Sequence, residues 1–133
     1  MTAAAALLAA LLARLRADAT LAADLDGRIW DTPPRNPGFP HLVVDEATSR
    51  DRSGLEAPLD DTRLVLRFVS RDGGRGELLA LVDRVETLLA APPLAPAGHR
   101  LIVLRRESLE TRPTRDRLGA EALLRVSALT EPA

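Results

Sequence analysis

The chain has 133 residues, a formal net charge of −1 at pH 7 and no cysteine. This length predicts one domain, residues 1–133, that can bury a core without disulfides. The near-neutral charge excludes the strongly basic surface that is typical of nucleic-acid binding, so we expect no sequence-specific nucleic-acid partner. Aromatic residues make up only 2% of the chain. The core should therefore consist of Leu, Val, Ala and Ile.

All 18 basic residues are arginine. The lack of lysine excludes mechanisms that need a lysine amine, such as a Schiff base or a phosphate-loop lysine. The apolar run Ala3–Ala13 is followed, not preceded, by positive charge, which is the wrong order for a signal peptide. The run is also too short to span a bilayer, so we expect no membrane association.

The first part of the chain has the leucine spacing of an amphipathic helix. The stripe consists of Leu7, Leu8, Leu11, Leu12 and Leu15. It predicts a helix over Thr2–Ala17 with Thr2 as its N-cap. A second short helix is expected over Thr20–Leu25, where Gly27 ends it.

A brief strand is expected at Arg28–Trp30. The following segment, Asp31–Pro40, holds four prolines and a glycine, which exclude a helix or a central strand. We expect a rigid loop that Phe39 anchors to the core. His41–Thr48 is predicted as a strand, and the charged Ser49–Asp61 as a long exposed hairpin connection, a kind of loop that is often functional. The candidate partner contacts in this connection are Arg50, Asp51 and Arg52.

The stretch Thr62–Leu89 holds the best strand signal and the best helix signal, joined by three glycines. A fully buried parallel strand would not carry Arg67 in its middle, so we expect an antiparallel or mixed sheet with one covered face. The helix presents an apolar stripe to that face. The stripe consists of Leu78, Leu81, Val82, Val85, Leu88 and Leu89.

Two further strands are expected, at Arg100–Glu107 and Ala120–Thr130. Irregular connections are expected at Pro92–Gly98 and Ser108–Gly119. The predicted class is α+β, with a mostly antiparallel four- to five-stranded sheet and two helices packed on one face, in the order α-β-β-β-α-β-β.

The two faces of this sheet should differ. The residues expected under the helices are Leu64, Leu66, Phe68, Ile102, Leu104, Leu124 and Val126. The residues expected on the other face are Val65, Arg67, Val69, Leu101, Val103, Arg105, Leu123, Arg125 and Leu129. A half-apolar face rich in arginine is typical of an interface. We therefore predict subunit or partner contacts at Val65, Arg67, Val69, Arg71, Arg105 and Arg125. The alternative is that one strand is out of phase, which would exchange its faces.

The sequence shows no catalytic constellation. The junction Gly73–Gly76 resembles a phosphate-binding turn, but Leu79 breaks the dinucleotide pattern and the phosphate-loop lysine is missing. We interpret it as a hinge. His41 and His99 lack further ligands at metal-site spacing. Asp45-Glu46 and Asp60-Asp61 flank one hairpin and could approach each other, but no general-acid partner accompanies them. We expect no enzyme activity, no cofactor and no metal.

Several segments together resemble the tail-completion, or tail-terminator, proteins of long-tailed phages and gene transfer agents. These are LRADATLAADLDGRIWDTPP, Phe39–Leu42, LRFVSRDGGRGE, Gly98–Leu101 and the closing LLRVSALTEPA. The resemblance covers nearly the whole chain. One departure is that Val69 and Val126 stand where such proteins often have aromatic residues.

The resemblance implies a structural protein that forms a hexameric ring, caps the tail tube and joins it to head-completion proteins. The implied partners are other copies of the chain, the tail tube protein and a connector protein. The implied location is the head-tail junction of a phage or gene transfer agent particle assembled in the bacterial cytoplasm. The alternative is an adaptor of a tail-derived secretion machine. An enzyme that uses the acidic pairs or the glycine junction is a third hypothesis.

Overall fold

The structure is a computed structural model that describes residues 1–54, 57–72 and 74–133. The described residues form, in chain order, α1 (Ala3–Ala17), α2 (Ala19–Leu25), β1 (Ile29–Trp30), β2 (His41–Asp51), β3 (Asp60–Ser70), α3 (Gly74–Ala90), β4 (His99–Pro113) and β5 (Ala120–Pro132). The described strands make a five-stranded sheet in the order β1-β2-β3-β5-β4. β1 pairs with β2 in parallel, and the other neighbours pair antiparallel. The predicted α+β class is confirmed.

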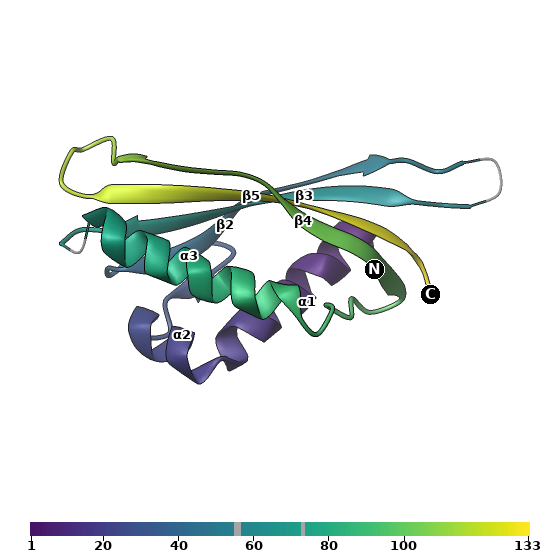
Figure 1. Ribbon diagram of the computed structural model, residues 1–133, viewed down its shortest axis with the longest axis horizontal. Coiled ribbons are helices and arrows are strands. Elements are labelled where there is room, and N and C mark those ends of the chain that lie inside the picture. Colours follow the sequence, from purple (N-terminus) through teal and green to yellow (C-terminus); the bar gives the residue numbers. More distant parts are fainter. Residues whose placement is uncertain (55–56, 73) are drawn as a thin grey trace.

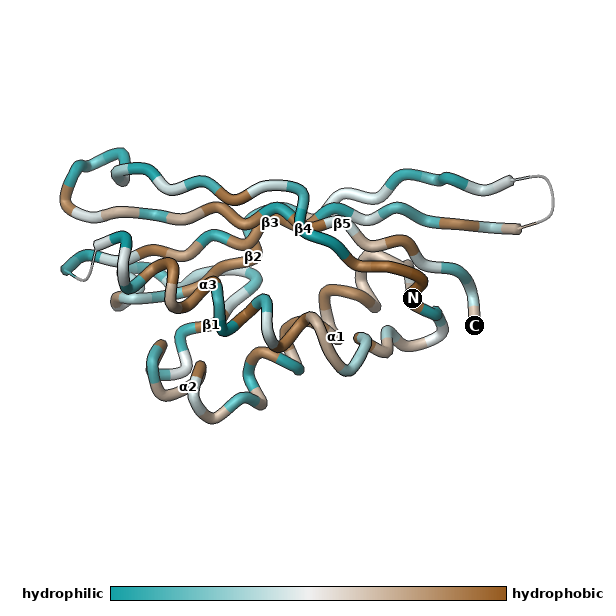
Figure 2. Tube along the Cα trace, viewed as in Figure 1, coloured by the Kyte–Doolittle hydropathy of each residue, from teal (hydrophilic) through white to brown (hydrophobic). Residues whose placement is uncertain are grey.

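The helices cover one face of the sheet, and the other face carries none of the described helices (Figure 1). Hydrophobic segments gather between the sheet and the helices (Figure 2). The core is aliphatic apart from Phe68, which is fully buried on the central strand β3. The largest fully buried side chains around it include Leu7, Leu11, Leu15, Leu21, Leu64, Leu66, Leu78 and Leu124. α2 adds a third, short helix to the two long ones expected on this face.

Asp18 ties the three described helices together. It ends α1 and caps α2, where its carboxylate accepts a hydrogen bond from the Leu21 amide at 2.9 Å. Arg84 of α3 donates to both oxygens of the same carboxylate, at 2.5 and 2.9 Å. This Asp18 side chain is only 11% exposed. The cap expected at Thr2 is also present, because its hydroxyl accepts from the Ala5 amide at 3.1 Å.

β2 and β3 are longer than the sequence indicated. The connection expected over Ser49–Asp61 is partly strand, because Arg50 pairs with Asp61 and Asp51 with Asp60. Most of this paired hairpin extends beyond the helices (Figure 1). Residues 45–51 are exposed to solvent. They therefore lack the apolar alternation by which a half-buried strand is recognised.

β4 corrects two further expectations. Residues 108–113 belong to the strand, although the charged sequence predicted an irregular connection. Register shifts between Leu101 and Val103 and between Arg106 and Ser108 break the period of two along β4. Ile102, expected in the core, is 45% exposed, and Leu101, expected on the other face, packs against the core. A bulge adds one residue to a strand and so exchanges the faces that follow it.

Phe39 was expected to anchor the loop to the core, but its side chain lies outside the core. It is half-buried, and its ring lies against the ring of His41 and under the guanidinium of Arg71.

Among the described residues, no helix has the length and apolarity to cross a membrane.

Arg84→Met should lower the midpoint of thermal unfolding at neutral pH, because it removes the guanidinium but keeps the aliphatic stem. The hydrogen bond from Arg84 is the largest cause that lowers the pKa of Asp18 below its ordinary 3.8. The stabilisation is therefore present above about pH 3.8 and is lost as the pH falls through the folded-state pKa. The gap between wild type and variant, measured by circular dichroism, should narrow in acid.

Asp18→Asn is the matched control, because asparagine is also a good N-cap but carries no charge. Its thermal midpoint should fall close to that of Arg84→Met. The difference in thermal midpoint between wild type and each variant should shrink in acid. A difference that stays constant from neutral pH to about pH 2 would contradict the assigned ion pair.

Candidate assembly surfaces

The surface of the sheet that points away from the helices is called the open face. Its residues alternate with the core residues along each strand. They include Val43, Asp45, Arg63, Val65, Arg67, Val69, Arg105, Glu107, Glu110, Arg112, Glu121, Leu123 and Arg125. The sequence-based phase of β3 and β5 is thus correct, because Leu64, Leu66, Phe68, Leu124 and Val126 are all buried under the helices.

Cross-strand ion pairs cover much of the open face. They are Arg67 with Asp45 at 3.5 Å and with Glu121 at 3.9 Å, Arg112 with Glu121 at 2.7 Å, Arg125 with Glu110 at 2.7 Å, and Arg63 with Glu107 at 3.4 Å. Val43, Val69 and Leu123 are at most 5% exposed on this face. Long arginine stems can cover apolar surface while the charged head stays in water. The face is therefore more polar than the alternation of Val and Arg suggested.

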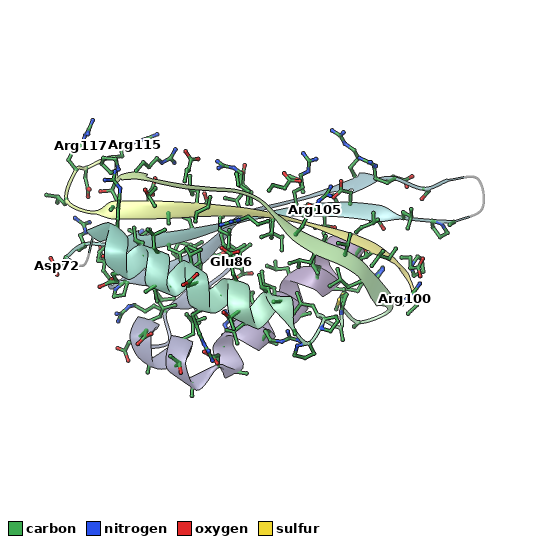
Figure 3. All side chains as sticks on the ribbon, in the orientation of Figure 1. Asp72, Glu86, Arg100, Arg105, Arg115 and Arg117 are labelled. Atoms are coloured by element: carbon green, nitrogen blue, oxygen red, sulfur yellow. The ribbon has the colours of Figure 1, made fainter. Side chains whose placement is uncertain are left out.

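Two of the predicted contact arginines, Arg50 and Arg105, form no ion pair with any described residue. Arg105 lies near the middle of the edge strand β4 (Figure 3). Arg50 belongs to the far end of the β2–β3 hairpin, about 20 Å along the strand from Arg67. The structure thus does not bring the predicted site residues into one patch.

The hairpin end has its own local order. The Asp51 carboxylate accepts a hydrogen bond from the Ser53 amide at 2.8 Å, and Arg52 approaches Asp61 at 3.8 Å. Hydrogen bonding from Ser53 lowers the pKa of Asp51, so this carboxylate stays charged at neutral pH. The loop between the strands contains Leu55 and Glu56, which lie outside the described residues.

At the other end of the open face lies a hollow of about 670 Å³, here called the basin. It is lined by Pro33, Pro37, Phe39, His41, Asp45, Arg67, Val69, Arg71, Arg112, Thr114, Arg115, Asp116 and Glu121. Arg71 joins its walls, because it pairs with Asp116 at 3.1 Å and lies 4.5 Å from the Phe39 ring centre. Arg115 and Arg117 point outward from the neighbouring β4–β5 turn (Figure 3).

His41 is buried in the wall of the basin, with 3% of its surface exposed. Its ring lies 5.7 Å from that of Trp30 and 5.1 Å from that of Phe39, and its Nδ1 is 2.8 Å from the Gly38 carbonyl oxygen. Burial lowers the pKa of His41 below 6.5, and the charges of Arg67 and Arg28 act in the same direction. His41 is therefore neutral at pH 7.

The β4–β5 turn is held by its own side chains. Thr114 donates from its hydroxyl to the Asp116 carboxylate at 2.6 Å, and the Leu118 amide donates to the same oxygen at 3.0 Å. Both hydrogen bonds lower the pKa of Asp116, and the one from Thr114 has the larger effect. Sequence reasoning missed Asp116, Arg112 and Glu121. Arg112 and Asp116 lie in the charged segment Ser108–Gly119, which predicts an irregular connection, and Glu121 lies at the start of the strand predicted at Ala120–Thr130.

The candidate catalytic groups stay apart. In the strand register Asp61 lies opposite Arg50, and Glu46 lies opposite Val65. The two acidic pairs are therefore separated by about 13 Å along the hairpin. α3 begins at Gly74, and Gly73 of the glycine junction lies outside the described residues. Within the described part of the chain, no cluster of His, Cys, Asp or Glu could hold a metal ion.

The family model described as "Tail completion protein gp17" matches residues 9–131. The chain belongs to this family. The resemblance drawn from the sequence segments is therefore confirmed. As a tail completion protein, the chain is a structural component of a phage or gene transfer agent tail.

A solved structure titled "Virion of native gene transfer agent (GTA) particle" contains a chain with the same fold. The TM-score is 0.86 at 23% sequence identity, over 98% of this chain and 99% of that chain. The likeness shows that this chain and that chain share one fold. No curated protein matches the sequence.

Gly119→Ala should destabilise the β4–β5 turn by about 1–3 kcal/mol, the range typical of overpacking. An added Cβ would collide with the Ser70 carbonyl oxygen and lie 3.1 Å from the Arg71 Cα, both backbone atoms of the β3 end. Chemical denaturation measures the loss. Gly54→Ala is the control, because nothing lies within 4 Å of its added Cβ. Equal midpoints for the two variants would refute the close approach.

The unfolding free energy should fall as the pH drops below about 6.5, because the unfolded chain then binds a proton that buried His41 resists. The loss should end once the pH passes the folded-state pKa of His41. His41→Phe keeps an aromatic ring beside Trp30 but cannot titrate, so its stability should depend less on pH between about 7 and 5. Urea unfolding across this range measures both slopes. Identical slopes would contradict the role of His41.

Proposed function

We propose that the chain forms a hexameric ring that ends the tail tube and joins it to the head-completion proteins. The observation that carries this proposal is the family match over residues 9–131. The number six and the two partners come from the resemblance to tail terminators. The chain needs no catalytic group for this role, and we infer that it is not an enzyme.

The shape of the chain is suited to such an assembly. A ring built by rotation needs two different, complementary surfaces on each subunit. The described chain offers distinct surfaces, because helices occupy one face of the sheet and hairpins extend from both ends (Figure 1). The β2–β3 hairpin carries Arg50, Asp51 and Arg52 at its end, where they can reach a neighbouring subunit or the tube.

The open face is the second candidate contact. Apart from Arg105, its arginines pair with carboxylates within the chain, and exposed ion pairs of this kind contribute little to stability. They can instead give orientation and specificity to a contact with another charged surface. We assign Val65, Arg67, Arg71 and Arg125 to a contact with the tube or the connector. Val69, predicted with them, is buried and can support this surface without touching a partner.

Negative-stain imaging of the purified protein at high concentration tests the ring. We expect class averages with six-fold symmetry, and light scattering should give about six times the monomer mass. The same measurements should be made after the protein is mixed with tail tubes from the particle that encodes it. A strict monomer in both conditions would refute the ring, and an open filament would favour an adaptor of a different kind of machine.

A further inference from the structure

The two long edges of the sheet are free over matched lengths. β1 pairs with β2 only at Leu42 and Val43, so residues 44–51 form one free edge. β4 is the opposite edge of the sheet. In the described chain, backbone hydrogen bonds other than those of the ladder do not reach the outer side of residues 44–51 or of 101–109.

The register places these two segments level with each other across the sheet. At one end Asp51 is level with Asp60, Thr130 and Leu101, and at the other Val44 is level with Leu66, Leu124 and Leu109. Midway, Thr48 is level with Arg63, Ser127 and Arg105. Residues 44–51 at one edge therefore match residues 101–109 at the other.

The directions of the two edges also match. β2 is antiparallel to β3, β3 to β5 and β5 to β4, so β2 and β4 run in opposite directions. A rotation about an axis parallel to the strands changes neither the direction nor the height of a strand. β4 of one subunit would thus meet β2 of the next antiparallel and level, with the helices of both subunits on the same side.

We propose that residues 44–51 of β2 in one copy of this chain pair antiparallel with residues 101–109 of β4 in the next copy, so that the sheet continues from subunit to subunit. This inference rests on the proposed ring and names the contact that closes it. An unpaired edge strand is a ready template for another strand. Here the template and its complement belong to the same chain.

Charge favours this pairing over a contact between two like edges. Three carboxylates and one arginine give residues 44–51 a net charge of −2, whereas two arginines and one glutamate give residues 101–109 a net charge of +1. In the level register Arg105 faces Thr48 and lies diagonal to Glu46, a spacing that long side chains can bridge. Arg50 lies on the other diagonal, level with the apolar Val103. Neither Arg105 nor Glu46 has an ion-pair partner among the described residues.

The β4 edge is also unusually apolar for a surface. Ile102 and Val103 are each 45% exposed, and they border a groove of about 310 Å³ between β4 and α3. Leu89, Pro93 and Leu104 are among the residues that line this groove. A neighbouring strand would cover both side chains. This arrangement leaves the open face to the tube or the connector.

Cysteine cross-linking tests the pairing, because the chain has no cysteine of its own. In Thr48→Cys/Arg105→Cys, the two sites of one subunit are separated by three strand spacings, about 14 Å. A disulfide needs a Cα–Cα distance under about 7 Å, so it can form only between subunits. Mild oxidation should give a ladder of covalent oligomers on a denaturing gel. Each single-cysteine variant should stop at dimers.

Two further double variants, Glu46→Cys/Arg105→Cys and Arg50→Cys/Arg105→Cys, detect a register that is staggered by two residues. A ladder from any of the three pairs, at least tenfold above Thr48→Cys/Arg112→Cys at the far end of β4, would support the pairing. Wild-type rings without a ladder from any pair would overturn this inference and leave the ring intact. Absence of wild-type rings, with and without tail tubes, would overturn the ring itself.

A second pair of variants does not depend on disulfide geometry. Ile102→Lys should reduce the ring fraction at least tenfold, while its circular dichroism and thermal midpoint stay close to wild type. Leu118→Lys is the control, because Leu118 is also an exposed large hydrophobic residue, at 67%, and lies in the β4–β5 turn outside both proposed segments. Equal ring fractions for the two variants would contradict the edge contact.

Discussion

The helical layer is shorter than the sheet that it covers, and most features of the molecule depend on this constraint. α3 has 17 residues, about 25 Å of helix, whereas β4 has 15 residues, about 50 Å of strand. The helices therefore leave the far part of the β2–β3 hairpin uncovered (Figure 1). Residues 45–51 of this hairpin and residues 115–118 of the β4–β5 turn remain in water, and their sequence is accordingly rich in charge.

Arginine side chains stabilise the surface of this long sheet where no helix covers it. A guanidinium pairs with carboxylates across strands while its stem shields the apolar residues beneath it. Arg67 illustrates both roles, because it reaches Asp45 and Glu121 on the two neighbouring strands while Val69 beside it stays buried. Exposed pairs add little to stability individually, so their main effect is to hold the surface in a defined shape.

The sequence predicted the parts of the fold that contact the core. The leucine stripes of α1 and α3 and the alternation in β3 and β5 each have an apolar period, and each was correctly placed. The end of β2 has no such period, because residues 45–51 are exposed on both faces. The end of β4 packs Leu109 against the core, but the residues around it are polar or charged. Ile102 was misplaced because a bulge is not visible in a pattern of residue types. The basin could not be predicted, since it joins the loop before β2 to a turn some 75 residues later.

Two of the three aromatic residues, Trp30 and Phe39, lie beside His41 at the wall of the basin. Trp30 is the one tryptophan of this chain, which has no tyrosine, and its ring adjoins that of His41. The intrinsic fluorescence of the protein therefore comes from a single emitter at the β1 edge, next to a group that titrates. The emission reports the surroundings of His41, whereas the two charged hairpins contain no tryptophan.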